Sequence, residues 1–193
     1  VVTRGATDTS WTITNFNPAP VTISPTGLAD TSSTKPAGTE QVLYAITALD
    51  NETKEESLAS LITVELVDPL LMLPTAQVQI SWNHMSGSDK YRIYKAIAGI
   101  YGIIAYVEGT SGTLSYDDGG LVANLSIAPP LEVEPTFDST DNYPGVVELF
   151  QQRIWFGRTN TLLRDLYASR AGSLFSFANS GVSTDADPIS QAI

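Results

Sequence analysis

The stretch that decides the fold is Gln77–Lys95, QVQISWNHMSGSDKYRIYK. Apolar side chains occupy every second position of its first half: Val78, Ile80 and Trp82. A period of two places one face of a strand in a core and the other in water. The corresponding positions of the second half are Tyr91, Ile93 and Lys95. The polar run Ser86–Asp89 between the halves has the composition of a turn. The stretch therefore predicts two strands of one buried sheet joined by a short turn.

A strand with a central Trp, a polar turn and a Tyr-x-Ile-Tyr strand is typical of strands B and C in fibronectin type III or immunoglobulin-like sandwiches. The composition also favours an all-β fold, because only 16% of the residues are charged and Thr, Ser, Val, Ile and Tyr are plentiful. At 193 residues, the chain is long enough for one large domain or two small ones.

The formal net charge of −11 argues against general affinity for nucleic acid or anionic membranes, which requires clustered cations. The absence of cysteine excludes disulfides, thiolate catalysis and cysteine-bound metal. No apolar run approaches about 18 residues, so no membrane span is expected. The start lacks the layout of a signal peptide. A start without Met and an end in mid-pattern predict a fragment of a longer protein.

A second strand pair is predicted earlier in the chain, at 40–50 and 58–66, around the polar loop DNETKEES. It looks like the last two strands of a fibronectin type III domain, yet it precedes Gln77–Lys95. We therefore expect a circularly permuted sandwich, in which the early hairpin lies beside the Tyr91 strand. Two truncated sandwiches are the alternative.

Four segments are expected on this basis. Residues 1–39 form a loop-rich lead-in with short strands near Trp11 and at Val21–Ser24, residues 40–128 form the sandwich, and 129–145 form a linker rich in Pro and acids. Residues 146–193 contain a hairpin around Gln151–Gln152 and a further strand. Two or three such strands are not stable alone, so they either pack on the sandwich or find partners beyond Ile193.

Motifs of enzyme chemistry are missing. The single histidine, His84, would need Ser86, Ser88 or a distant serine and an acid to form a hydrolytic site, and we expect it to be a surface residue at a strand end. The chain has no Gly-x-Ser-x-Gly elbow and no phosphate-binding Gly-rich loop followed by Lys. The sequence therefore predicts neither an enzyme nor a cofactor or small-molecule substrate.

Carboxylates occur in adjacent pairs, as in Glu55–Glu56 and Asp117–Asp118. Adjacent strand residues point to opposite faces, so neither pair forms a catalytic dyad by itself. Asp117 and Asp118 could bind calcium together with backbone carbonyls, although turn formation explains the same residues. No metal site is predicted.

One charge feature indicates a possible interaction surface. Four of the ten basic residues lie within 18 positions that hold a single acid, Asp165: Arg153, Arg158, Arg164 and Arg170. Arginine is the cation best suited to forked contacts, so this patch fits an acidic partner surface or passing phosphate. Pairing with the acidic linker at 132–141 explains it equally well.

The last third of the chain contains three motifs: Tyr143-Pro144, Phe150-Gln-Gln-Arg153-Ile-Trp-Phe156-Gly157 and Leu166-Tyr-Ala-Ser169-Arg170-Ala-Gly172-Ser-Leu-Phe175-Ser-Phe177. Together they resemble a pattern in tail proteins of short-tailed bacteriophages and prophages. Upstream, the following residues look like the permuted sandwich of these proteins: Tyr44–Ala48, Glu55–Ser57, Trp82, Tyr91–Lys95, Tyr101-Gly102 and Tyr116–Asp118. The motifs are collinear and cover roughly residues 40–190. The run Leu162–Asp165 departs from the family pattern, which has a Pro-Gln-Thr type sequence there.

The resemblance implies a tail nozzle or tubular component, built on a β-propeller with an inserted fibronectin type III-like domain. Such proteins form homo-oligomeric rings below the portal and adaptor, so the expected partners are other copies, tail proteins and head–tail connector proteins. The expected location is the virion tail, where DNA passes without sequence-specific binding. The alternative is a carbohydrate- or protein-binding sandwich module, in which Trp11, Tyr101 or Tyr106 could stack on sugar.

Overall fold

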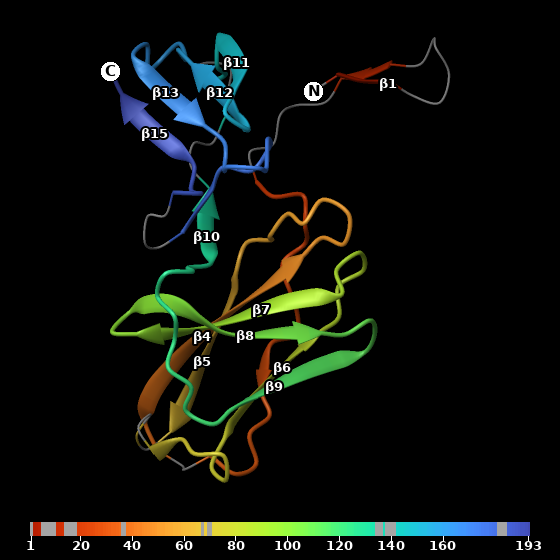
Figure 1. The fold of residues 1–193 in the computed structure, drawn as a ribbon, viewed down its shortest axis with the longest axis vertical. Helices are drawn as coiled ribbons and strands as arrows, with labels where there is room; N and C mark the ends of the chain where they lie inside the picture. The colour runs from red at the N-terminus through yellow and green to blue at the C-terminus, as the bar shows by residue number, and fades with distance from the viewer. Residues whose placement is uncertain are drawn as a thin grey trace. The chain divides into compact units, whose positions relative to one another are not determined.

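The computed structural model describes residues 2–4, 11–13, 19–35, 38–66, 68, 71–133, 137, 142–180 and 185–193. It is all-β, as the sequence predicts (Figure 1). The described strands are β1 (Val2–Arg4), β2 (Trp11–Ile13), β3 (Ala29–Asp30), β4 (Glu40–Leu49), β5 (Ser60–Leu66), β6 (Val78–Asn83), β7 (Lys90–Ile97), β8 (Ile100–Glu108), β9 (Thr113–Asp118), β10 (Pro130–Val133), β11 (Val146–Phe150), β12 (Arg153–Gly157), β13 (Asp165–Ala168), β14 (Ala178–Ser180) and β15 (Ile189–Ala192).

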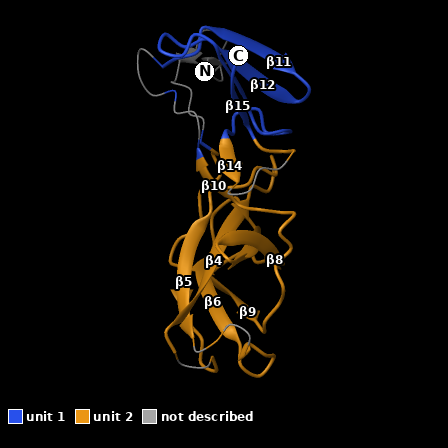
Figure 2. Cartoon of the chain, turned by 90° about the vertical axis from the view of Figure 1, so that its left-hand side faces the viewer, with its two compact units in different colours: residues 1–19, 133–177, 188–193 blue, residues 20–132, 178–187 orange. Residues whose placement is uncertain are grey.

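The chain divides into two compact units, coloured in Figure 2. The sandwich unit contains residues 20–132 and 178–187, and the small-sheet unit contains 1–19, 133–177 and 188–193. This division differs from the predicted boundaries at both ends of the sandwich. Residues of the predicted lead-in join the sandwich, since β3 pairs with β6 and the Thr31 N–H donates to the Gln79 carbonyl at 2.9 Å.

Two antiparallel sheets form the sandwich, with strand orders β3-β6-β9 and β5-β4-β7-β8. The prediction that β6 and β7 share one sheet is therefore wrong. The Ser86–Asp89 turn carries the chain from one sheet to the other. The rings of Trp82 and Tyr91 pack together in the core, with their centroids 5.6 Å apart. A period of two predicts which face of a strand is buried, but it does not say which strand lies alongside.

The early hairpin completes this sandwich. Strand β4 pairs with β7 from Tyr44 opposite Lys95 to Ala48 opposite Tyr91, which confirms the predicted docking beside the Tyr91 strand. A single core results, rather than two truncated sandwiches. It includes the buried side chains of Val42, Tyr44, Ile46, Val64, Leu66, Val78, Ile80, Trp82, Tyr91 and Ile93.

The outer face of the four-stranded sheet carries a second, smaller apolar cluster of Ala45, Tyr94 and Ile103. The segment that follows β9 closes over it, because Ile103 exchanges backbone hydrogen bonds with Asn124, at 2.9 and 3.1 Å. Glycine is required at position 102, where a Cβ would lie 2.7 Å from the Asn124 backbone. This segment thereby buries part of the face that a bare sheet would leave in water.

The small sheet has the antiparallel order β11-β12-β13-β15. Its first hairpin turns at Gln151–Gln152, both with positive φ (50° and 60°), as a two-residue turn that matches strand twist requires. The hairpin is therefore confirmed, and β15 adds a strand that the sequence did not predict. One face carries edge-to-face and stacked rings from four aromatic residues: Phe137, Phe156, Tyr167 and Phe177.

Three local predictions concern the segments before and after the sandwich, and two of them are wrong. Val21–Ser24 is not a strand, and the side chains of Val21 and Ile23 are exposed. The predicted linker at 129–145 contains β10, which pairs with β14, and the buried Phe137. Its residues 134–136 and 138–141 lie outside the described part of the chain. The predicted short strand near Trp11 is confirmed as β2, which pairs with β1.

Candidate functional sites

A buried ion pair joins the two sheets of the sandwich. Asp118, the last residue of β9, is fully buried, and its Oδ2 accepts hydrogen bonds from Lys95 Nζ at 2.8 Å and from the Tyr44 hydroxyl at 2.9 Å. Its Oδ1 accepts the backbone N–H groups of Gly120 and Leu121, both at 2.9 Å. Both oxygens are thus satisfied from within the protein, which a buried carboxylate requires.

The alternation that placed Lys95 on the side of Tyr91 and Ile93 is confirmed, since Lys95 is only 8% exposed. Burial, together with the nearby Asp118 charge, raises the pKa of Tyr44 far above its usual value. These groups lock the sheets together, and none of them is left to react with a ligand.

The calcium reading of Asp117 and Asp118 does not agree with the geometry. Asp118 points into the core, whereas Asp117 Oδ1 accepts a hydrogen bond from Gln79 Nε2 at 2.8 Å. The two carboxylates therefore lie on opposite faces of β9. Among the described residues, no cluster of three or more acidic, histidine or cysteine side chains could hold a metal ion.

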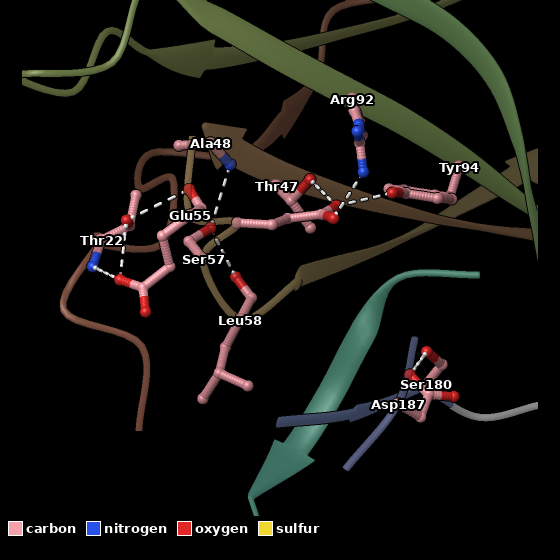
Figure 3. A network of polar contacts seen from close by, with 11 residues as sticks. Thr22, Thr47, Ala48, Glu55, Ser57, Leu58, Arg92, Tyr94, Ser180 and Asp187 are labelled. Carbon is pink, nitrogen blue, oxygen red and sulfur yellow. Dashed lines mark hydrogen bonds and ion pairs between the residues drawn. The ribbon is translucent and has the colours of Figure 1, made fainter. Parts of the chain in front are cut away.

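Glu56 forms a second polar network, on the outer face of the four-stranded sheet (Figure 3). Its carboxylate accepts hydrogen bonds from the Thr47 hydroxyl at 2.7 Å, the Tyr94 hydroxyl at 2.6 Å and the Arg92 guanidinium at 2.6 Å. Burial, followed by the charge of Glu56, raises the pKa of Tyr94 strongly. The guanidinium of Arg92 also lies 5.9 Å from the centre of the Tyr106 ring, a cation–π distance.

The carboxylate of Glu55, next to Glu56 in the chain, binds a different segment of the protein. Glu55 Oε2 accepts the backbone N–H group of Thr22 at 3.2 Å (Figure 3) and that of Val21 at 2.8 Å. Glu55 and Glu56 thus bind different segments, although they lie in the loop between β4 and β5 and not on a strand as predicted. Between them these residues fix the β4–β5 loop to two parts of the fold, which indicates a structural role.

The single histidine does not form a hydrolytic site with the nearby serines. His84 Nε2 lies 3.3 Å from Asp89 Oδ1, and its ring packs edge-on against Tyr91. Ser88 is buried in the turn, where its carbonyl accepts the Tyr91 hydroxyl at 2.7 Å. The same hydroxyl accepts the Met85 N–H at 2.7 Å, so Tyr91 holds the turn shut.

The four arginines of the predicted interaction patch have different surroundings. Arg153 is buried and donates to the Ser169 carbonyl at 2.6 Å, so it does not belong to such a surface. Arg158 and Arg164 are exposed, at the two ends of the loop between β12 and β13, and Arg170 is half-buried. Arg158 and Arg164 are thus the two exposed members of the predicted patch, and we refer to these two residues as the cationic patch.

Sequence reasoning missed the exposure of β11. Four of its five side chains are large and apolar, and each exposes more than half of its surface: Val146 57%, Val147 60%, Leu149 61% and Phe150 57%. The loop that carries the cationic patch adds Leu162 at 45% and Leu163 at 62%. The available signal was an apolar strand, interrupted only by Glu148, whose apolar residues occupy both faces, because this pattern indicates a strand that is covered on both faces.

Comparisons with protein-family models, with curated proteins and with solved structures give no match to this chain. Within its described residues, no helix is both long and apolar enough to cross a membrane.

Proposed function

We propose that this chain is a non-enzymatic structural component of a phage or prophage tail, which assembles with further copies of itself into a ring around the DNA path. The observation that carries the proposal is the exposed strand β11, an apolar edge of the small sheet. Monomeric proteins rarely leave such a strand open, because it invites pairing with another chain. In a protein that assembles with further copies, such a strand can pair with another chain.

The internal use of the charged groups supports a structural role. The carboxylates of Asp118 and Glu56 and the imidazole of His84 bind other side chains of the fold. They hold the sheets, the β4–β5 loop and the turn between β6 and β7. Such internal networks fit a protein that acts through its surface.

The architecture fits the resemblance stated for the sequence. We assign the sandwich to a permuted fibronectin type III type, because the early hairpin takes the place beside β7 that the final hairpin occupies in the ordinary order. The antiparallel order β11-β12-β13-β15 fits one blade of a β-propeller. The net charge of −11 suits a conduit for DNA, because strong attraction to phosphates would slow its passage.

Electron microscopy of the assembled particle tests this function. We expect the protein, alone or mixed with head–tail connector and other tail proteins, to form closed rings visible by electron microscopy. A protein that stays strictly monomeric with these partners present contradicts the proposal.

A carbohydrate-binding module is the second candidate, because Tyr106 exposes 64% of its surface and could stack on a sugar ring. Tyr101 is partly buried, and the side chain of Trp11 lies outside the described residues. Binding on a glycan array that disappears with Tyr106→Ala would favour this candidate, whereas an array without signal would remove it.

A further inference from the structure

Two edge strands, one in each unit, pair with a neighbour on one side only. Strand β11 pairs with β12 in the small sheet, and β5 pairs with β4 in the sandwich. An edge strand presents unpaired backbone N–H and C=O groups, which form hydrogen bonds with any strand that adds to it. The question is which strand each of these edges accepts.

Strand β11 is well suited to accept another strand. Phe150 and Arg153 flank the two-residue turn, and in such a hairpin the flanking residues exchange backbone hydrogen bonds. By alternation, the backbone groups of Val147 and Leu149 point away from β12. Neither proline nor lysine interrupts the strand, and its one charge is Glu148. The usual devices that block an edge are therefore weak here.

Self-pairing of β11 in full register is disfavoured by its sequence. An antiparallel pair of two β11 strands centred on Glu148, the register that pairs all five residues, would place the Glu148 side chains of the two copies directly opposite each other. Like charges at directly opposite positions destabilise a strand pair. A different strand can pair with the whole of β11 without this repulsion.

Charge complementarity points to β5. The small-sheet unit has five basic and six acidic residues, a net charge of −1, and its exposed Arg158 and Arg164 lie at the end of the sheet where β11 begins. The sandwich unit has five basic and fifteen acidic residues, a net charge of −10. At the end of β5, Glu65 is exposed, and so is Glu40, which lies opposite Leu66.

Strand β5 also has the matching surface. It is seven residues long, and three of its side chains point outward and are exposed: Leu61, Thr63 and Glu65. Leu61 exposes 58% of its surface. The outward face of β5 thus has an apolar residue near its start and an acid near its end, which fits an apolar strand that begins beside a basic loop and runs antiparallel to β5.

We propose that β11 of one copy adds to β5 of a second copy, with Arg158 and Arg164 placed against the acidic end of β5. The contact is heterologous, since different surfaces meet, and contacts of this kind close into rings when the rotation between copies allows it. The inference rests on the proposed self-assembly and names its interface.

Cysteine cross-linking tests the pairing directly, because the chain has no cysteine of its own. Val147→Cys protein is mixed under mild oxidation with each of three β5 variants, Leu61→Cys, Thr63→Cys or Glu65→Cys. We expect a mixed disulfide dimer with at least one of them. Thr113→Cys on β9, another exposed strand threonine, is the matched control and should give none. The pairing is overturned if the Val147→Cys homodimer predominates, or if none of the three mixtures gives a mixed dimer.

A charge exchange provides the second test. Arg158→Glu/Arg164→Glu and Glu40→Lys/Glu65→Lys should each weaken self-association about tenfold in Kd. Mixing the two variants should restore association, because opposite charges then face each other in both kinds of contact between the two variants, whereas like charges meet only between identical copies. Rings that form unchanged in both variants would overturn the β5 interface and leave the proposed function standing. A wild-type chain that is monomeric at every concentration would remove both.

Discussion

The two units of this protein treat their apolar and charged groups in opposite ways. The sandwich unit buries Trp82, Tyr44 and Tyr91 completely and satisfies even a fully buried carboxylate, that of Asp118, from within. The small-sheet unit gathers four aromatic rings on one face, yet leaves β11 exposed along its whole length. The buried core thus lies mainly in one part of the chain, and the exposed apolar strand lies in the other.

This contrast gives the sequence patterns of the units different meanings. In the sandwich, the apolar residues alternate with polar ones, and each strand has one face in the core. In β11, apolar residues occupy both faces, and the described structure covers neither. The first pattern is satisfied within the chain, and the second predicts a partner.

The largest effect should follow from removing the central core residue. Trp82→Ala should lower the free energy of unfolding by about 3–5 kcal/mol, since the side chain is fully buried between the sheets. Urea denaturation measures the loss. Trp155→Ala in the half-buried part of β12 is the control and should cost clearly less. Equal losses would contradict the division between the two units.

Breaking the buried ion pair should have an effect of similar size. Lys95→Met leaves the charge of Asp118 buried and unpaired, at a cost of about 3–5 kcal/mol. Lys90→Met is the matched control, because the Lys90–Glu108 pair is exposed and should contribute about 0–1 kcal/mol. Adding Asp118→Asn to Lys95→Met should recover part of the loss. A Lys95→Met protein as stable as Lys90→Met would show that the pair does not hold the sheets together.

Alkaline pH should weaken the sandwich through its buried tyrosines. The pKa values of Tyr44 and Tyr94 are raised mainly by burial, so the folded state keeps these hydroxyls protonated. The stability they contribute is fully present below the unfolded pKa of about 10 and falls above it by about 1.4 kcal/mol per pH unit for each tyrosine. Urea midpoints between pH 8 and 12 measure this slope.

Tyrosine-to-phenylalanine variants isolate that contribution. Tyr44→Phe with Tyr94→Phe should be less stable at pH 8, because each variant leaves a buried carboxylate without one hydrogen bond. The same double variant should lose less stability than wild type as the pH rises above 10. A double variant with the wild-type slope would mean that other groups cause the alkaline transition.

The smallest effect on folding is expected in β11. Leu149→Lys should change the free energy of unfolding by no more than about 0.5 kcal/mol, because the side chain is 61% exposed. Ile46→Lys in the fully buried part of β4 is the contrasting variant and should prevent stable folding. If Leu149→Lys were as damaging as Ile46→Lys, β11 would be a core strand and not a surface.

The sequence was sufficient for the sandwich wherever local pattern determines structure. Alternation identified the buried faces of β4, β6 and β7, and the early position of the 40–66 hairpin predicted that it lies beside Tyr91. The Gln151–Gln152 turn was evident from the polar pair between two apolar runs. The buried faces and the turn depend on neighbours in the chain, which a single sequence displays. The docking of the hairpin was inferred from its likeness to the last two strands of a fibronectin type III domain.

Other features that depend on distant contacts could not be predicted. The partners of β6 and β7 lie in opposite sheets, and the short turn between them is compatible with either arrangement. Phe137 stands in a segment with the composition of a linker, and only its packing with Phe156 and Phe177 explains its burial. Charge counting likewise grouped Arg153 with Arg158, although the backbone carbonyl of Ser169 holds Arg153 inside the sheet.

The mass of the protein in solution across a range of concentrations tests the central claim, that β11 is an assembly surface, most directly. Sedimentation of the wild type should show oligomers that grow with concentration, and Leu149→Lys, folded by the urea criterion, should remain monomeric. A wild type that is strictly monomeric even with tail partners present, or a Leu149→Lys variant that assembles as the wild type does, would contradict the claim.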